Sequence, residues 1–354
     1  MKRKILPIIL CILSALIALC SGCSKNITPI SQTDFYFDTV ITITLYDTNR
    51  LGTKRCNEIL ASCFSLCESY EAMFSRTKEG SDIWNINHAD GAPITVHPET
   101  AALLQKSLFY CEQTNGLVDI TIAPVTDLWD FSSEHLLQLQ NTDTSDTETP
   151  LSSLPTKEQL TNRLAHVDYK KVNITGNTVT LKDADAALDL GCIAKGYIAD
   201  CLKMHLQAQG ISCAIINLGG NLQTLGTKPD GSPFLLGIQK PSGDNRTPIA
   251  TLPVTDSSLV SSGVYERYFE AGGIRYHHLL NPRTGLPENN GLLGVTILTA
   301  SSADADILST AAFLLGLEKG MAYIDSLPDT EAVFITEDGS LHPTDGLSGL
   351  LQMP

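Results

Sequence analysis

Asp306 and Thr310 place a carboxylate and a hydroxyl four positions apart near the end of the sequence. In an α-helix these positions lie one turn apart on the same face, so the two side chains would point in the same direction. Two oxygen ligands of this kind suit a hard cation such as Mg²⁺, which binds few protein groups and keeps water or phosphate oxygens as its other ligands. The same spacing is common on ordinary solvated helix faces, which is the alternative interpretation.

The flanking residues predict that this segment is helical. Ser301-Ser302-Ala303-Asp304 has the form of a capped helix start, because the first serine hydroxyl can bond the backbone three residues later. Apolar residues then recur at helical spacing as far as Leu315, and Gly316 permits an end. Such a helix would present Asp306 and Thr310 together.

The first residues have the pattern of a secretory signal. Positive residues 2–4 are followed by an apolar run at 5–19 and by Ser21-Gly22-Cys23. The apolar run is too short and wrongly flanked for a transmembrane helix. The ending resembles that of bacterial lipoproteins, which are cleaved before a cysteine that carries the lipid. We expect a signal peptide over 1–22, a lipid on Cys23, and a chain anchored on the extracytoplasmic face of the cell membrane. A plain secretory signal cut nearby is the alternative.

The charge balance excludes several kinds of partner. The formal net charge is −15, and loss of residues 1–22 would remove three positive charges and no acidic ones, leaving −18. So negative a surface argues against nucleic acid and against electrostatic binding to anionic lipid. A covalent lipid is therefore the expected tether to the membrane.

Seven cysteines remain beyond the signal and Cys23, and they lack the paired close spacing of a zinc site. An odd number leaves at least one thiol free. Cys56, Cys63 and Cys67 fall on one face of a predicted helix, where burial as small apolar residues is the favoured interpretation.

Helices and strands alternate along the chain, which predicts one α/β (α+β) body with mixed sheets and flanking helices. We place this body at 34–346, after a tether at 23–33 and before a tail at 347–354. Residues 132–157, rich in Ser, Thr, Asp and Pro, are predicted to form an inserted variable loop. The predicted helices cover 51–74, 99–114 and 194–209. The predicted strands cover 37–46, 118–125, 171–175, 178–181 and 214–218, with a hairpin turn at Gly176-Asn177.

Four sequence motifs recur in an order that points to a known family. They are GLVDITIAP with DLW at 116–124 and 127–129, LDLGCIAKGY at 188–197, HLLNPRTG at 278–285, and ADILSTA at 305–311, with NLGGN at 217–221 between the second and the third. In this order the motifs closely resemble the ApbE family of bacterial FAD:protein FMN transferases, which are often lipoproteins. The resemblance covers about 34–346 and implies a T-fold-like flavin transferase fold.

The resemblance also implies an activity. Such an enzyme uses Mg²⁺ to cleave the pyrophosphate of FAD, attaches FMN through a phosphoester bond to a Thr or Ser hydroxyl of a partner protein, and releases AMP. The implied acceptor carries a flavinylation motif and is a respiratory complex subunit or an extracytoplasmic electron carrier. FAD pyrophosphatase activity giving FMN and AMP, and a non-catalytic FAD-binding lipoprotein, are the alternatives.

The family assigns roles to particular positions of this chain. Asp306 and Thr310 match metal ligands, and the position of Cys192 matches a residue that binds the metal through its backbone carbonyl. Positions matching FAD contacts are Phe37, Thr77, Leu117, Val118, Asp119, Asp189, Lys195 and Leu280. Among these, a turn for Asp119, a core position for Leu280 and a surface salt bridge between Asp189 and Lys195 remain the structural alternatives.

His278 is the candidate general base, because imidazole can take the proton that a free hydroxyl holds near neutral pH. Its alternative role is to orient the substrate. His277 would face solvent if the segment is a strand, because neighbours point to opposite faces. The chain departs from many relatives at Ser75-Arg76-Thr77, which stands where they have Ser-Thr-Tyr, and at Asn281, which replaces a frequent Asp. Gly219-Gly220 suit either a tight turn or close approach of backbone to a phosphate.

Overall fold

The computed structural model describes residues 28–132, 134–136, 154–241 and 247–354. The predicted signal peptide, Cys23 and most of the predicted loop at 132–157 lie outside the described residues. Within the described ranges, no helix is both long enough and apolar enough to cross a membrane.

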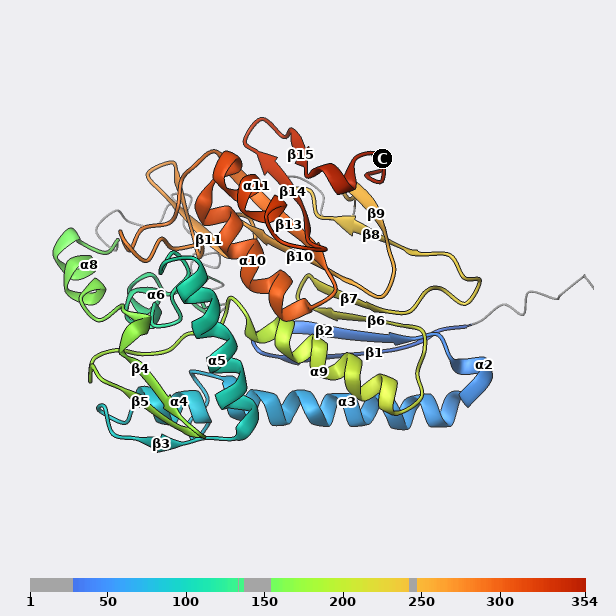
Figure 1. The fold of residues 1–354 in the computed structure, drawn as a ribbon, viewed down its shortest axis with the longest axis horizontal. Coiled ribbons are helices and arrows are strands. Elements are labelled where there is room, and N and C mark those ends of the chain that lie inside the picture. The colour runs from blue at the N-terminus through green and yellow to red at the C-terminus, as the bar shows by residue number, and fades with distance from the viewer. Residues whose placement is uncertain (1–27, 133, 137–153, 242–246) are drawn as a thin grey trace, which may run out of the picture.

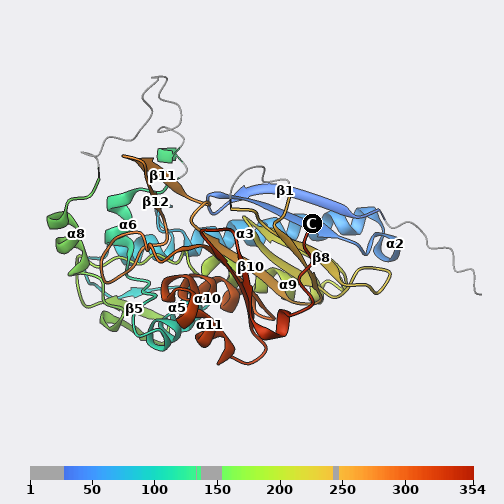
Figure 2. The same ribbon diagram turned by 90° about the horizontal axis from the view of Figure 1, so that it is seen from above.

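An antiparallel sheet of eight strands forms the centre of the molecule (Figures 1 and 2). Its order is β1 (Ile30–Tyr36), β2 (Thr39–Leu45), β6 (Ala214–Leu218), β7 (Asn221–Leu225), β10 (Ser258–Gly263), β13 (Leu292–Thr299), β14 (Glu331–Thr336) and β15 (Leu341–Pro343). Side chains alternate between the two faces, so Ile41, Ile43 and Leu45 of β2 all point into the main core and are fully buried.

One face of this sheet is covered by α3 (Thr53–Phe74), α9 (Ala194–Ala208), α10 (Ser302–Leu315) and α11 (Leu317–Asp325), whose buried side chains belong to the main core. Helix α9 contacts both α3 and α10, and α10 contacts β10 and β13. The hairpin of β8 (Phe234–Ile238) and β9 (Ala250–Val254) packs in a second core with residues such as Ile215 and Leu222, which point to the other face. The sheet is therefore covered on both sides.

Smaller elements form the end of the molecule at the left of Figure 1. They are α4 (Asp82–Asn87), α5 (Pro98–Gln113), α6 (Ala123–Trp129), α8 (Lys157–Leu164), the sheet of β3 (Ile94–Thr95), β5 (Thr178–Leu181) and β4 (Val172–Thr175), and the hairpin of β11 (Tyr268–Ala271) and β12 (Ile274–His277). Short helical turns complete the fold: α2 (Thr48–Leu51), η2 (Tyr169–Lys171) and η3 (Asp345–Leu347).

The start and the end of the chain differ from the sequence prediction. Strand β1 already begins at Ile30, inside the predicted tether, and the predicted strand over 37–46 begins only at Thr39. Phe37 and Asp38 have φ of 55° and 57°, which is the left-handed backbone of a two-residue hairpin turn. At the other end, the predicted tail is packed, because Gln352 pairs with Thr251 of β9 through two backbone hydrogen bonds of 2.8 and 2.9 Å.

The predicted strand over 118–125 is wrong. Helix α6 begins at Ala123, with Pro124 in its first turn, where the missing N–H is harmless. The β pairing of this segment is limited to a single parallel bridge between Ile122 and Ala187. The predicted loop at 132–157 also extends one residue too far, because Lys157 is the first residue of α8. Thr156 and Gln159 cap the start of this helix through reciprocal hydrogen bonds.

The other predicted elements are present. Helices α3, α5 and α9 lie within two residues of their predicted bounds, and Gly176-Asn177 join β4 to β5. Gly219-Gly220 join β6 to β7 as a tight turn, with φ of 58° and 91°. All seven described cysteines are free thiols, and Cys56, Cys63 and Cys67 are buried as predicted.

Candidate active site

The site is built where α9 and α10 touch. A Cβ on Gly196 of α9 would lie 2.1 Å from the backbone oxygen of Ser302, so only glycine permits this approach. The Gly196 N–H donates a 2.9 Å hydrogen bond to Oδ2 of Asp306 on α10. Asp306 is 4% exposed, so the interpretation of this helix face as a solvated one is wrong.

Asp200, one turn further along α9, fixes the start of α10. Its carboxylate accepts from the backbone N–H groups of Ser302 at 2.8 Å and Ala303 at 3.0 Å, and from the Ser301 hydroxyl at 3.1 Å. Ser301 in turn caps Asp304, as the sequence predicts. An acidic group at a helix N-terminus accepts hydrogen bonds from the free N–H groups there, and its negative charge interacts favourably with the helix dipole. Asp306 is therefore held against α9 by two groups of that helix, the Gly196 N–H and the Asp200 carboxylate.

The second oxygen of Asp306 faces Lys195. The Lys195 Nζ lies 3.5 Å from Asp306 Oδ1 and donates to the Gly191 carbonyl at 3.1 Å. One turn along α10, Thr310 Oγ1 lies 3.3 Å from the Ser262 hydroxyl. The carboxylate and the hydroxyl therefore lie one turn apart on the same helix, as predicted.

The third candidate oxygen is the Cys192 carbonyl, which lies two residues before the first residue of α9. No described residue donates a hydrogen bond to it. Burial raises the pKa of the Cys192 thiol well above its usual value, so its sulfur is a poor ligand. A carboxylate, a hydroxyl and an unpaired carbonyl are the oxygen donors that a hard cation such as Mg²⁺ prefers, so these residues fit the ion.

One of the two neighbouring histidines occupies a different environment from the one expected. His277 is 5% exposed, donates from Nε2 to the Glu288 carbonyl at 3.1 Å, and packs edge-on against Phe313 of α10. The prediction that His277 faces solvent is therefore wrong, because β12 ends at this residue and packs it against the core.

His278 is half-buried just after the end of β12. Its Nδ1 lies 3.3 Å from the Arg267 carbonyl, which only accepts, so Nδ1 carries the proton and Nε2 offers a lone pair. Burial, with the nearby His277, Arg267 and Lys195, lowers the pKa of His278 to about 3. The ring is therefore neutral at neutral pH and can accept a hydrogen bond.

Asp189 and Lys195 do not pair with each other. Asp189 Oδ1 accepts from the Gly191 N–H at 2.8 Å, and Oδ2 lies 3.3 Å from Arg76 Nε. The same guanidinium contacts Asp127 Oδ1 at 2.6 Å. Arg76 thus joins the residues after α3 to α6 and to the segment before α9. The sequence reasoning gave Arg76 no role, although it lies between the polar Ser75 and Thr77 directly after a long helix.

The loop at 117–119 is more deeply buried than its predicted role suggests. Leu117 and Val118 are 8% and 3% exposed and belong to the main core. Asp119 Oδ1 accepts from the N–H and hydroxyl of Thr121 at 2.8 and 2.6 Å, and Oδ2 accepts from the Tyr169 N–H at 3.0 Å. Both carboxylate oxygens are engaged, which favours the turn role for Asp119.

The remaining predicted contacts lie in three different settings. Phe37 is partly buried in the β1–β2 turn, and its N–H donates to Glu71 at 2.8 Å. Thr77 is exposed, and its hydroxyl lies 3.2 Å from that of Ser75. Leu280 is buried in a cluster with Val125, Trp129, Phe131 and Leu160, which favours its core role.

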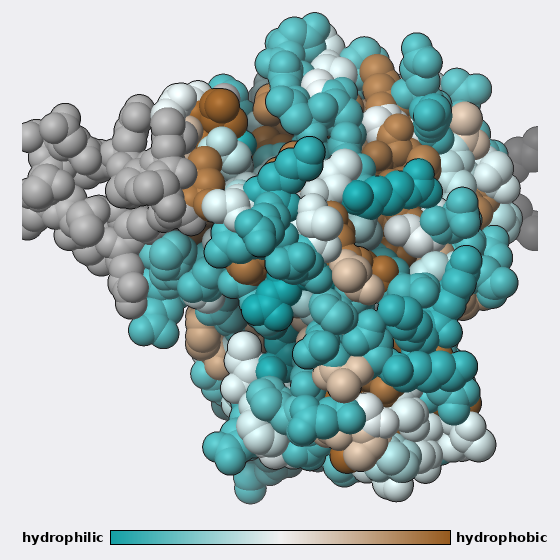
Figure 3. Space-filling model, turned by 90° about the vertical axis from the view of Figure 1, so that its left-hand side faces the viewer, coloured by the Kyte–Doolittle hydropathy of each residue, from teal (hydrophilic) through white to brown (hydrophobic). Residues whose placement is uncertain are grey.

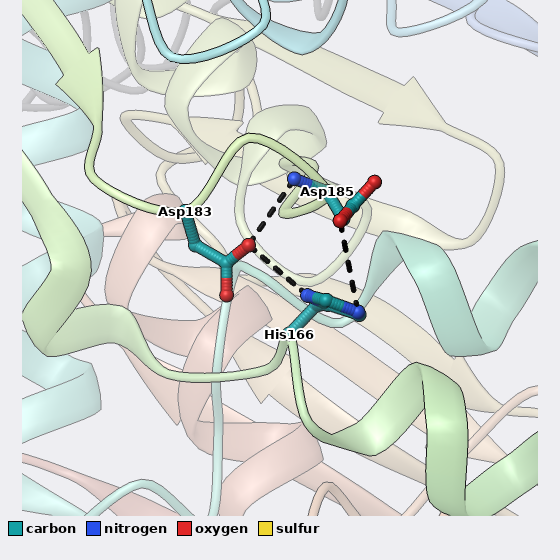
Figure 4. Close-up of side chains that lie close together, drawn as sticks. All are labelled: His166, Asp183 and Asp185. Atoms are coloured by element: carbon teal, nitrogen blue, oxygen red, sulfur yellow. Dashed lines mark hydrogen bonds and ion pairs between the residues drawn. The ribbon is translucent and has the colours of Figure 1, made fainter.

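A second cluster of ionisable groups lies at the exit of β5 (Figure 4). His166 Nδ1 lies 3.0 Å from Asp183 Oδ1, and His166 Nε2 lies 4.0 Å from Asp185 Oδ2. The Lys171 ammonium already holds the other Asp183 oxygen at 2.9 Å, and it is the main reason that the pKa of Asp183 falls to about 2. The surface at this end of the molecule is mostly hydrophilic (Figure 3). The cluster is a neutralised surface network that ties the segment before η2 to β5.

Comparison with known proteins agrees with this architecture. The family model for the ApbE family matches residues 37–334. The FAD:protein FMN transferase of Treponema pallidum is 29% identical, over 96% of this chain and 93% of its own length, and one from Klebsiella pneumoniae is 35% identical over 80% and 84%. The flavin transferase ApbE structure from Vibrio cholerae has a TM-score of 0.77 at 26% identity, and the ApbE protein structure from Thermotoga maritima 0.78 at 25%; each comparison covers 91% of this chain and 99% of the other.

The fold and the match over nearly the whole length of these relatives define the chain as a transferase enzyme. The chain belongs to the ApbE family.

Proposed function

We propose that the protein transfers FMN from FAD to a Thr or Ser hydroxyl of an acceptor protein and releases AMP, with Mg²⁺ bound at Asp306, Thr310 and the Cys192 carbonyl. The observation that carries the proposal is the buried Asp306 carboxylate at the α9–α10 contact, one helical turn from Thr310. The Cys192 carbonyl just before α9 has no partner among the described residues. The names of the relatives support FAD as the donor and a protein as the acceptor.

The residues around this point suit phosphoryl transfer, in which the protein mainly positions groups and stabilises charge. Mg²⁺ would supply positive charge to the pyrophosphate oxygens. Lys195, only 3.5 Å from Asp306, would bring a second positive charge to the same place. Arg76 would hold Asp189 and Asp127 in fixed positions beside the nucleotide.

His278 would align the incoming hydroxyl. Its unprotonated Nε2 can accept a hydrogen bond from the hydroxyl, while Nδ1 is held by the Arg267 carbonyl. Since the lowered pKa of His278 makes its charged form unfavourable at neutral pH, we propose the orienting role for it rather than the role of general base.

We further propose that the mature chain is attached through a lipid on Cys23 to the extracytoplasmic face of the cell membrane. Cys23 precedes Ile30, the first residue of β1, by seven positions. Seven residues span at most about 25 Å when fully extended, so the enzyme would work close to the membrane surface. An acceptor that is a membrane complex subunit or a membrane-associated electron carrier would lie within reach.

The direct test mixes the protein with FAD, Mg²⁺ and a small carrier protein that bears the sequence Asp-Gly-Xaa-Thr-Gly-Ala-Thr. We expect the carrier to gain the mass of FMN less one water, as a phosphoester on a threonine, with one AMP released for each FMN attached. FMN and AMP released at the same rate with and without the carrier would instead establish a pyrophosphatase. Bound FAD that stays intact under both conditions would establish a binding protein.

A further inference from the structure

Two serines that the proposed mechanism leaves unused lie beside Thr310, where β10 meets α10. Ser262 of β10 has its Oγ 2.7 Å from Ser309 Oγ and 3.3 Å from Thr310 Oγ1, and Ser309 Oγ lies 2.8 Å from the backbone carbonyl oxygen of Asp306. Ser262 is 7% exposed and Ser309 is fully buried. Among the described residues, these three hydroxyls have no other hydrogen-bond partner. They form one continuous row that begins at Thr310 and ends on the backbone of Asp306.

The direction of each hydrogen bond in this row follows from its protons, because a hydroxyl carries one proton and a carbonyl oxygen carries none. Ser309 must therefore donate to the Asp306 carbonyl. Its oxygen then accepts from Ser262, since two oxygens 2.7 Å apart need a proton between them. Because the one proton of Ser262 is used in that bond, Ser262 can only accept from Thr310. The Thr310 hydroxyl is thus the donor, and both of its lone pairs remain free.

This direction is the one that a metal-binding hydroxyl needs. A neutral hydroxyl binds a cation through a lone pair, so its proton has to be donated to another group. Ser262 is the acceptor for that proton. The bond from Thr310 to Ser262 is the longest of the three, at 3.3 Å, and it becomes stronger when a bound cation polarises the Thr310 O–H group.

The strand that carries Ser262 is itself fixed along α10. Ser258, on the same face of β10, donates to the Ser302 hydroxyl in the first turn of α10 at 2.8 Å. Four residues of a strand span about 13 Å. The eight residues from Ser302 to Thr310 span about 12 Å of helix. Because the two lengths match, serine contacts near both ends of α10 set its position along β10, and Ser262 stays opposite Thr310.

We propose that Ser262 and Ser309 are positioning residues that hold the Thr310 proton away from the metal site, so that the lone pairs of Thr310 face the cation. This inference rests on the proposed function, because it takes Thr310 as a ligand of Mg²⁺. Loss of the Ser262 hydroxyl would leave the Thr310 proton without this acceptor. Loss of the Ser309 hydroxyl would let the Ser262 proton turn to Thr310 and occupy one of its lone pairs.

The first test measures binding of Mg²⁺ alone to the protein by titration calorimetry, together with the Mg²⁺ concentration that gives half-maximal transfer. Both should show 10–100-fold weaker binding in Ser262→Ala, the usual effect of removing a group that orients a metal ligand. Ser309→Ala should also bind Mg²⁺ more weakly, and alanine is well tolerated in a helix. Ser261→Ala is the matched control, because it removes the neighbouring hydroxyl on the opposite face of β10, which bonds Thr296 at 2.8 Å, and it should bind Mg²⁺ as the wild-type protein does.

A double-mutant cycle separates positioning of Thr310 from a general structural role. If Ser262 acts through Thr310, Ser262→Ala should cause no further loss of Mg²⁺ affinity in a protein that already carries Thr310→Val. Flavin fluorescence titration without Mg²⁺ should give the same FAD affinity for every variant.

Three results would overturn the inference: wild-type Mg²⁺ affinity in Ser262→Ala, an equal loss with and without the Thr310 hydroxyl, or a matching loss of FAD affinity. A wild-type protein that neither binds Mg²⁺ nor needs it for transfer would contradict the proposed function instead. The two failures are therefore distinguishable.

Discussion

The α9–α10 contact and the cluster at the exit of β5 both gather carboxylates with basic side chains, yet they differ in how the charges are satisfied. Asp183 has its two oxygens held by Lys171 and His166, next to the exposed Asp185. Asp306 is buried, accepts one backbone N–H, and faces a lysine at the longer distance of 3.5 Å. Both oxygens of Asp183 are paired without a ligand, whereas Oδ1 of Asp306 has no closer partner than this lysine among the described residues.

This difference shows that residue types alone do not define a metal site. The β5 cluster has the more conventional ligands, a histidine and two aspartates, but its carboxylate is neutralised and close to solvent. In the metal site that we propose at the α9–α10 contact, only one ligand is acidic, and the backbone would supply another. The close approach of the two helices at Gly196 brings Asp306 against α9.

The largest expected effect separates the two regions directly. Asp306→Ala should abolish transfer, because it removes the acidic ligand, while alanine is well tolerated in a helix. Asp183→Ala should leave transfer unchanged and cost at most about 1 kcal/mol of stability, as for other partly exposed ion pairs. The comparison is checked by measuring FMN transfer at saturating Mg²⁺ and thermal unfolding for both variants. Near-normal transfer by Asp306→Ala would contradict the proposal that Asp306 binds the metal.

The next prediction concerns the glycine that brings the helices together. Gly196→Ala would place its Cβ 2.1 Å from the Ser302 oxygen, so α10 must move away. We expect a loss of about 1–3 kcal/mol of stability from overpacking, and a transfer rate lower by on the order of 10²-fold from misplaced groups. Gly176→Ala, in a turn where nothing lies within 4 Å of the added Cβ, is the control for a general effect of glycine replacement. Equal rates for the two variants would contradict the role of the helix contact.

A smaller effect is expected from the buried His277. Burial lowers its pKa from 6.5 to about 4. Between pH 6.5 and 4, His277 is therefore protonated in the unfolded chain but not in the folded chain. The free energy of unfolding falls as the pH falls through this range. Between pH 7 and 5 this residue should cost about 2 kcal/mol, at roughly 1.4 kcal/mol for each pH unit below 6.5.

Urea unfolding of the wild-type protein and of His277→Gln at both pH values measures this contribution, because the carboxylates titrate alike in the two proteins. The wild-type protein should lose more stability than the variant on acidification. Parallel losses in both would show that His277 titrates normally in the fold.

The smallest expected effect is that of Cys192→Ala. If the backbone carbonyl and not the sulfur faces the metal, the variant should keep most of its transfer activity. A variant as inactive as Asp306→Ala would place the sulfur in the site. An intermediate loss with unchanged Mg²⁺ dependence would indicate packing alone.

Local patterns in the sequence were enough for the long helices, the β4–β5 hairpin and the capped start of α10. Each depends on neighbours within a few positions: apolar spacing, a capping serine, or a glycine turn. The same local signals put Asp306 and Thr310 on one helix face. The order of the four motifs was enough to identify the family, which the comparisons confirm.

Only the tertiary structure decided which side chains are buried and which lie close to one another. No local signal shows that His277 is buried while His278 is only half-buried, or that Arg76 bridges Asp127 and Asp189. The physical reason is that burial and charge act through space, so the tuning of each ionisable group depends on contacts that sequence spacing does not record.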